Sequence, residues 1–305
     1  MYSIYYRSTK DTKLKKLDKI RHGSWVNVDN ATEDDIRYVC EITNLAYDDV
    51  DDALDSQEIP RIEKKGKSVL IFLRNPTPET DGFHTQLLTI VITPEYFISI
   101  SPQTNSIVES YVTDPNGLLT TQRTKLLLSI LLSIVNQYAK EMKTARAQAQ
   151  KINQLSGVTA QEIIDLTKNE QILNQYLVAL IPTRNIFEAL LGEKIISLYQ
   201  SDTDLLEDLT ISIRQSVDVC TIELKSIQSI RNAHQIIFNN DLNKTIKLLT
   251  SFTIIMTIPT IIASLYGMNI SLPLSDHPFA FGIIMLIIFG LSILGIVIFR
   301  LLRWL

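Results

Sequence analysis

Residues 248–267 have the sequence LLTSFTIIMTIPTIIASLYG, and residues 279–299 have the sequence FAFGIIMLIIFGLSILGIVIF. Neither stretch contains a charged residue. A helix needs about 20 predominantly apolar residues to cross the hydrocarbon core of a bilayer, and each stretch is long enough. A pair of buried helices in a soluble core is the alternative, but a core helix of this length normally has a polar face, which the second stretch lacks. The two stretches therefore predict a transmembrane hairpin.

Basic residues flank this hairpin on one side only. Lys244 and Lys247 precede the first stretch, Arg300 and Arg303 follow the second, and the connecting residues 268–278 contain neither Lys nor Arg. Short loops rich in Lys and Arg stay in the cytoplasm. We therefore expect a multi-pass protein of the plasma membrane with both termini in the cytoplasm and a short external loop.

The rest of the chain is acidic and excludes several function classes. The 305 residues carry a net charge of −4, and the last 65 of them carry +2, so residues 1–240 carry −6. That balance gives no positive field for nucleic acid. The sequence has no P-loop, no nucleophile elbow and no His-Glu-x-x-His pattern, so we expect no enzyme, no organic cofactor and no ATP-driven pump.

The N-terminal part is predicted to be an α+β cytoplasmic domain of the αβα type. Thr32 and Asp35 have the spacing of a capping box and predict a helix that ends at Leu45. β-rich runs bounded by turn residues predict the strands. They are residues 2–7, 24–28, 68–74, 86–92 and 96–100.

Helical periodicity replaces the strand pattern after residue 120. Residues 123–154 and 159–192 predict an antiparallel pair joined by a break at 156–158, and Pro182 is expected to kink or split the second helix. A third helix is expected from Ser201, with Ser201 or Asp202 as N-cap, running unbroken into the first span. The predicted organisation is an α/β domain (1–120), a helical hairpin (121–200), a stalk helix (201–267) containing the first transmembrane helix (248–267), an external loop (268–278), a second transmembrane helix (279–299) and a basic tail (300–305).

An apolar stripe on the stalk follows a heptad pattern, which predicts helix–helix association. Association of several chains and burial within one chain are both compatible with this pattern. The stripe comprises Ile213, Val217, Cys220, Leu224 and Ile227.

A polar stripe continues along the same helix and into the first span. Its ten members are three or four residues apart, so they share one helix face, and nine are polar and uncharged. Ser and Thr in membrane helices often bond to their own backbone or to a neighbouring helix, but a stripe of this length favours the lining of a pore. The stripe comprises Asn232, Gln235, Asn239, Asn243, Ile246, Thr250, Thr253, Thr257, Thr260 and Ser264.

One helix cannot enclose a pore, so we expect a cyclic homo-oligomer within the lipid bilayer. The stripe contains no carboxylate that could bind a bare cation tightly. Mg²⁺ dehydrates reluctantly and keeps several waters, whose hydrogens amide and hydroxyl oxygens can accept. The stripe therefore predicts passage of a hydrated divalent cation, driven by the membrane potential at about 4.6 kcal/mol for two charges at about 100 mV.

Tyr266-Gly267-Met268-Asn269 closes the first span, directly before the external loop. This motif, followed by one further span and a basic tail, resembles the signature of CorA-type divalent cation transporters. The resemblance implies a funnel-shaped homopentamer in which Asn269 holds hydrated Mg²⁺ at the external mouth and Gly267 and Met268 shape that ring. It also implies channel closure by cytoplasmic Mg²⁺, which makes Mg²⁺ both cargo and regulator.

Regulatory positions are inherited from the same resemblance. Asp208 matches an acid implicated in regulatory Mg²⁺ binding, while Asn232 replaces an aspartate of some relatives, and only Asp276 gives the external loop an acid. Basic residues 64, 65 and 67 stand where relatives often have acids, so the sensing site is expected to be reduced or rebuilt. An acidic run lacks the glycine and glutamate of a calcium loop; it is expected to be a solvated helix, or to add to divalent binding. The run includes Asp48, Asp49, Asp51 and Asp52.

Two alternatives stay open at this point. Zn²⁺, Co²⁺ or Ni²⁺ could be the cargo, as in the ZntB branch, which has the same Gly-Met-Asn motif. The protein could also be a non-conducting, membrane-anchored coiled-coil scaffold, although a scaffold has no need of a polar stripe through the bilayer.

Overall fold

The computed structural model describes residues 2–80, 82–115, 118–153, 159–192, 195–196, 198–270, 272–274 and 277–304. The chain divides into two compact units, residues 1–231 and 232–305. Each unit is described by itself.

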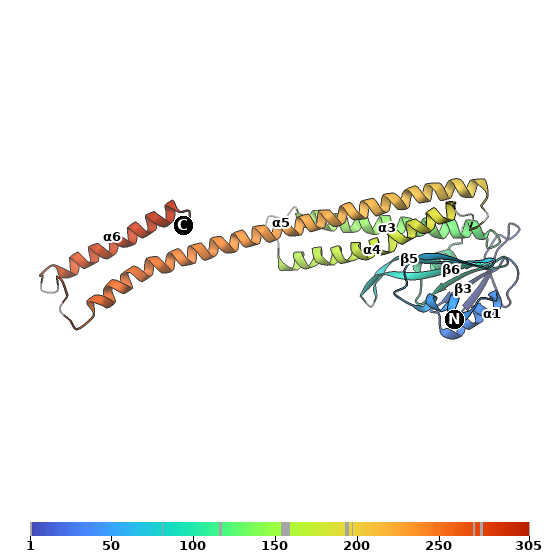
Figure 1. Ribbon diagram of the computed structural model, residues 1–305, viewed down its shortest axis with the longest axis horizontal. Coiled ribbons are helices and arrows are strands. Elements are labelled where there is room, and N and C mark those ends of the chain that lie inside the picture. Colours follow the sequence, from blue (N-terminus) through green and yellow to red (C-terminus); the bar gives the residue numbers. More distant parts are fainter. Residues whose placement is uncertain are drawn as a thin grey trace. The chain divides into compact units, whose positions relative to one another are not determined.

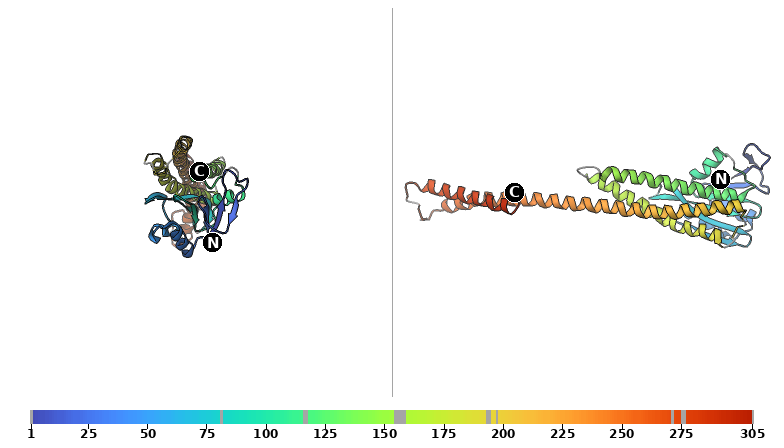
Figure 2. Two further views of the ribbon diagram at one scale, coloured as in Figure 1. Left: turned by 90° about the vertical axis from the view of Figure 1, so that its right-hand side faces the viewer. Right: turned by 90° about the horizontal axis from the view of Figure 1, so that it is seen from above.

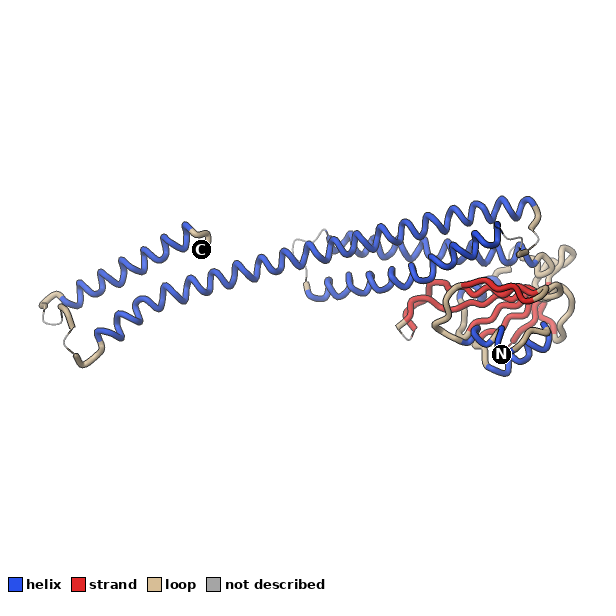
Figure 3. The backbone as a smooth tube through the Cα atoms, viewed as in Figure 1, coloured by secondary structure: helices blue, strands red, loops and turns tan. Residues whose placement is uncertain are grey.

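A seven-stranded sheet organises the first unit (Figures 1 and 3). Its order is β2-β1-β3-β7-β6-β5-β4, and all neighbours are antiparallel except β3 and β7. The strands are β1 (Tyr2–Tyr6), β2 (Lys15–Leu17), β3 (Trp25–Asp29), β4 (Arg61–Lys65), β5 (Ser68–Thr80), β6 (Phe83–Ile92) and β7 (Phe97–Ser101).

Alternating apolar residues give the sheet two buried faces. On β5, Val69, Ile71 and Leu73 belong to one apolar cluster, whereas Leu70 and Phe72 belong to another. Side chains of successive strand residues point to opposite faces, so one strand contributes to both clusters. Helices cover both faces: α1 (Glu33–Thr43) with two short 3₁₀ turns, η1 (Tyr47–Asp49) and η2 (Asp51–Leu54), on one side, and α2 (Ser106–Thr113), α3 (Arg123–Asn153) and α4 (Ala160–Gly192) on the other (Figure 1). The predicted αβα arrangement is confirmed.

Local signals place the start of α1 correctly. Thr32 and Asp35 form the predicted capping box, in which the Asp35 N–H donates to Thr32 Oγ1 and the Thr32 N–H donates to the Asp35 carboxylate. The helix ends at Thr43 rather than Leu45, because Asn44 has the left-handed conformation. The strand β2 and the helix α2 were not predicted.

The helices α3 and α4 form the predicted antiparallel pair (Figure 1). Gln154 and the predicted break at 156–158 lie outside the described residues. Pro182 does not split α4, which continues to Gly192. Proline leaves the carbonyl four residues earlier without its N–H donor, and here that residue, Val178, is exposed to water.

The helix α5 (Gln200–Tyr266) begins one residue before the predicted start. The N–H groups of Asp202 and Thr203 donate to the carbonyl of Tyr199, so Ser201 and Asp202 lie inside the helix and the predicted N-cap is wrong. Its first part runs beside α3 and α4 (Figure 2). The heptad stripe is buried within one chain: Cys220 and Ile227 have no exposed surface, and the Cys220 thiol donates to the carbonyl of Leu173 on α4.

The second unit contains the rest of α5 and α6 (Ala280–Leu301). Both helices are long and apolar enough to cross a membrane. Their candidate spans are 6% and 0% buried in the single chain, which separates them from the core helices of a soluble protein.

Candidate functional site

The predicted polar stripe lies on an uncovered face of α5. All ten of its side chains, from Asn232 to Ser264, are exposed in the single chain. Ile246 interrupts the polar series and is itself 51% exposed. The stripe is therefore a continuous helix face with no covering element among the described residues of the second unit.

The helix α6 packs on roughly the opposite side of α5. A Cβ atom at Gly295 would lie 3.7 Å from Ile255 Cγ1 and 3.8 Å from Ile258 Cδ1, so these two side chains of α5 contact α6 there. Ser251 lies on the same side of α5 and is fully buried. At 3.6 residues per turn, this contact face points about 150° away from the stripe. The contact with α6 thus lies on the apolar side of α5, and the polar stripe has no such contact.

Threonine hydroxyls of the stripe have a fixed hydrogen-bond arrangement. The hydroxyls of Thr253, Thr257 and Thr260 donate to the carbonyls of Leu249, Thr253 and Met256, at 2.9, 2.7 and 3.0 Å. This is the backbone bonding that the sequence left open as an alternative explanation for the threonines. A hydroxyl that donates internally still has lone pairs, so these oxygens can accept hydrogen bonds from a hydrated cation.

The motif at the end of α5 forms a tight turn. Tyr266 is the last helical residue, and the N–H groups of Gly267 and Met268 donate to the carbonyls of Ala263 and Leu265. A Cβ atom at Gly267 would lie 3.3 Å from the Ala263 carbonyl oxygen, closer than nearly all side-chain contacts. Glycine at this position therefore lets the chain leave the helix without crowding its last turn.

Asn269 follows this turn and is exposed, with no hydrogen-bond partner among the described residues. Tyr266 Oη donates to the Pro273 carbonyl at 3.3 Å, which ties the loop to the helix end. His277 Nδ1 accepts from the Phe279 N–H at 3.2 Å just before α6. These contacts leave the Asn269 carboxamide available to a ligand. Asp276 lies outside the described residues.

The acidic run of the first unit is largely occupied by the chain's own cations. Lys65 Nζ lies 2.8 Å from Asp49 Oδ1, and Arg61 Nη2 lies 2.6 Å from Asp52 Oδ2. The hydrogen bond to Asp49 raises the pKa of Lys65. Burial opposes the charge of Arg61, but hydrogen bonds to Glu63 and Asp52 raise its pKa. The run forms η1 and η2 rather than an α-helix.

The remaining predicted regulatory acids are not brought together. Asp48 and Asp51 lie on η1 and η2, and Asp208 is exposed on α5. The described part of a single chain contains no group of three His, Cys, Asp or Glu residues placed to hold a metal ion. A regulatory site built from these acids would therefore need a second chain.

Comparison with protein families matches residues 21–301 to the family described as CorA-like Mg²⁺ transporter protein. The chain belongs to this family. The predicted CorA resemblance is thus confirmed.

Individual CorA relatives extend over the whole chain. The cobalt/magnesium transport protein CorA of Methanocaldococcus jannaschii is 23% identical over 305 residues, with 95% of each chain covered. The complete structure of the CorA magnesium transporter of this organism has a TM-score of 0.82 at 22% identity, covering 98% of this chain and 97% of that chain. This likeness confirms the CorA fold: a mixed α/β domain, a long helix and two C-terminal apolar helices.

Two other structures share the fold of this CorA-family chain at lower identity. The full-length CmaX protein has a TM-score of 0.73 at 16% identity, covering 99% of this chain and 97% of that chain. The cytoplasmic domain of ZntB from Vibrio parahaemolyticus has a TM-score of 0.63 at 11% identity, covering 78% and 97%. The family is one of divalent cation transporters, and these likenesses do not distinguish its cargoes.

The sequence did not lead us to predict the contact between α5 and α6. Ser251 is a hydroxyl on the apolar side of α5, and it donates to the Lys247 carbonyl at 2.7 Å. A small residue on an otherwise apolar face was the available signal for close packing, as was Gly295 within α6. The pairing of Asp49 with Lys65 had no signal, because the two residues approach only when β4 forms.

Proposed function

We propose that this protein is a CorA-type channel that moves hydrated Mg²⁺ across the plasma membrane, driven by the membrane potential. One observation carries the proposal: α6 contacts α5 at Ile255 and Ile258, on the side away from the stripe, while a face of amide and hydroxyl oxygens stays uncovered. A polar face within hydrocarbon needs a polar neighbour or water. Copies of the same chain arranged around an axis would supply both.

The proposed assembly is a funnel-shaped homopentamer with both termini in the cytoplasm. Pore-facing residues would run from Asn232 at the inner entrance to Thr257 within the bilayer, and the Asn269 carboxamides would form the external mouth. The oxygens along this path accept hydrogen bonds from water but carry no net charge. They would stabilise the hydration shell and still release the ion.

Gating by cytoplasmic Mg²⁺ is the second part of the proposal. Asp208, Asp48 and Asp51 remain available for divalent binding at a subunit interface. Asp49 and Asp52 already form ion pairs with Lys65 and Arg61. Mg²⁺ would have to displace these cations, so we expect gating to need more Mg²⁺ than a site of free carboxylates would.

Replacement of Asn269 by Ala tests the mouth. The full chain is reconstituted in proteoliposomes, and Mg²⁺ uptake is measured at a fixed potential, with native mass measurement of the oligomer. We expect uptake to be lost while five subunits still assemble, because methyl groups cannot bind the hydration shell. Uptake equal to wild type would remove Asn269 from the mouth, and a stable monomer would refute the pore.

The same vesicles separate the possible cargoes. Zn²⁺, Co²⁺ and Ni²⁺ are each offered in place of Mg²⁺ at equal concentration. The stripe contains no Cys or His, and softer metals bind tightly to such ligands. We therefore expect Mg²⁺ flux to dominate; faster Zn²⁺ flux would assign the chain to zinc transport, and no flux of any cation would favour a scaffold.

A further inference from the structure

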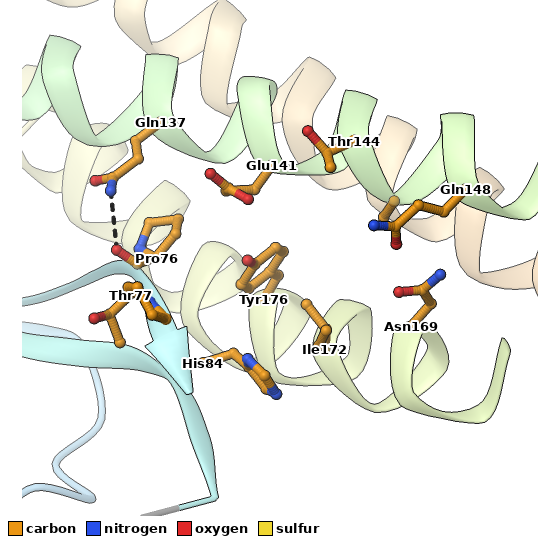
Figure 4. Close-up of a pocket in the computed structure, with 12 residues that line it drawn as sticks. Pro76, Thr77, His84, Gln137, Glu141, Thr144, Gln148, Asn169, Ile172 and Tyr176 are labelled. Carbon is orange, nitrogen blue, oxygen red and sulfur yellow. Dashed lines mark hydrogen bonds between the residues drawn. The ribbon is translucent and has the colours of Figure 1, made fainter. Parts of the chain in front are cut away.

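A cavity of about 340 Å³ lies in the first unit. It lies between α3, α4 and the end of the β5–β6 hairpin (Figure 4). Pro76, Ala145 and Ile172 give it apolar walls, and several polar side chains interrupt them. The polar lining residues include Thr77, His84, Gln137, Glu141, Thr144, Gln148, Asn169 and Tyr176.

Hydrogen bonds hold the walls of this cavity in place. Gln137 Nε2 donates to the Pro76 carbonyl at 3.0 Å, which ties α3 to β5 (Figure 4). The His84 N–H donates to Gln175 Oε1 at 2.7 Å, and Gln175 Nε2 donates to the Gly82 carbonyl at 2.9 Å, which tie α4 to the hairpin. The cavity is therefore a formed feature of the fold rather than a gap between loose elements.

Two nearly buried polar groups face the cavity without a partner. Tyr176 is 4% exposed and Asn169 is 6% exposed, and neither side chain forms a hydrogen bond within the described part of the chain. Neither side chain contributes an atom to the fully buried, unpartnered polar atoms of the described residues, so their polar atoms are open to the cavity and can bond to water or a ligand there. Figure 4 shows the Tyr176 hydroxyl directed toward Glu141 and the Asn169 amide opposite Gln148.

The charge of the cavity is negative. Glu141 is its only carboxylate and forms no salt bridge with any described residue. The neighbouring basic residues of α3, Lys143 and Arg146, line a different cavity beside α5, where Arg146 pairs with Glu223 at 3.4 Å. Burial, and then the charge of Glu141, raise the pKa of Tyr176, so its hydroxyl stays protonated and its ring keeps an electron-rich face.

We propose that this cavity binds a small organic ammonium ion. The Glu141 carboxylate would accept charge-assisted hydrogen bonds from the ammonium group, and Gln148 and Asn169 carbonyl oxygens would accept its remaining protons. The Tyr176 ring would lie against the cation, and Ile172, Ala145 and Pro76 would contact its methylene groups. A hydrated metal ion would gain nothing from such apolar walls, which is why the organic cation fits better.

Such a ligand would contact α3, α4 and the hairpin together. Because it would bind the folded state, the ligand would stabilise the first unit. Its occupancy does not depend on the pore, so failure of this site would leave the proposed transport function intact.

Calorimetric titration of the full-length oligomer with 1,4-diaminobutane tests the proposal. 1,4-Butanediol, which has the same carbon chain without charge, serves as the neutral comparison, and MgCl₂ as the metal comparison. We expect the diamine to bind and the diol to fail. Glu141→Gln should weaken diamine binding at least 10-fold, because it removes the only carboxylate among the lining residues. Tyr176→Leu should weaken binding several-fold, because it keeps an apolar side chain but removes the aromatic ring that would lie against the cation.

Glu207→Gln is the matched control, because Glu207 is an exposed carboxylate on α5 outside the cavity. It should bind the diamine as wild type does, and thermal unfolding curves establish that each variant is folded. Diamine affinity equal to that of the wild type in both the Glu141 and the Tyr176 variants would overturn the proposal. Binding of the diol as tight as the diamine would overturn it too, as would Mg²⁺ displacing the diamine with the same dependence on Glu141.

Discussion

Replacing Thr257 by Val probes the polar stripe at the depth of the bilayer. Val has nearly the shape of Thr but lacks the hydroxyl, so the variant removes one oxygen from the stripe and leaves the side-chain volume unchanged. The hydroxyl of Thr257 donates to the Thr253 carbonyl at 2.7 Å, and that carbonyl still accepts the backbone bond of the helix. The helix should therefore remain intact.

The expected effect follows from the number of oxygens removed. A hydrogen bond from the hydration shell of the ion to one hydroxyl contributes at least ~0.5 kcal/mol net. A ring of five proposed subunits would therefore lose about 2.5 kcal/mol of binding free energy for the hydrated ion. If that loss raises the barrier to passage, the rate falls roughly 70-fold, at about 1.36 kcal/mol per factor of ten. The same arithmetic applies to Thr253, which has the same hydrogen-bond geometry.

Flux is measured in proteoliposomes that contain a Mg²⁺ indicator, at a potential set by a potassium gradient. Thr245→Val is the matched control, because the Thr245 hydroxyl also donates to a backbone carbonyl, that of Asp241 at 3.0 Å, but lies about a quarter turn away from the stripe. We expect the control to conduct normally. Equal flux in the Thr257 and Thr245 variants would show that the stripe does not line the conduction path.

Two further predictions concern the first unit. Burial raises the pKa of Cys220 to about 12, so at pH 8 its thiol stays protonated and should not react with a maleimide until the protein is unfolded. Half-buried Cys40 should react in the native state. Mass spectrometry of peptides measures both reactions, and labelling of Cys220 in the native protein would contradict its burial. Tyr138→Phe should lower the free energy of unfolding by ~1 kcal/mol, because the buried hydroxyl donates to the Arg74 carbonyl at 3.0 Å. Tyr199→Phe is the control and should leave this free energy unchanged, because Tyr199 is 77% exposed. Chemical unfolding followed by fluorescence measures both variants, and equal stability of the two would refute the reasoning.

Elements with strong local signals could be predicted from the sequence. The capping box at Thr32 located α1, and the helical period located α3, α4 and α5 to within a few residues. The strand β2 was missed because its sequence, Lys15–Leu17, is short and polar. Such edge strands form because a neighbouring strand supplies hydrogen bonds, which no local pattern reports.

Only part of the candidate site could be predicted from the sequence. The polar stripe depends on spacing along one helix, so it could be located without a structure. The cavity at Glu141 could not, because its residues come from α3, α4 and a hairpin that are distant in sequence. The ion pair between Lys65 and Asp49 could not be predicted either, because it forms only when η1 packs beside β4.

Association of several chains follows from the asymmetry of α5 itself. Its apolar side contacts α6 at Gly295 and otherwise exposes apolar side chains, which are suited to lipid. Its polar side carries hydroxyls whose protons are used internally but whose oxygens remain open to donors. Acyl chains donate no hydrogen bonds, so a lone hairpin would leave these oxygens unsatisfied in hydrocarbon. Rotating the polar faces of several copies toward a shared, water-containing axis removes that penalty, and the same arrangement supplies the acceptors that a hydrated cation requires.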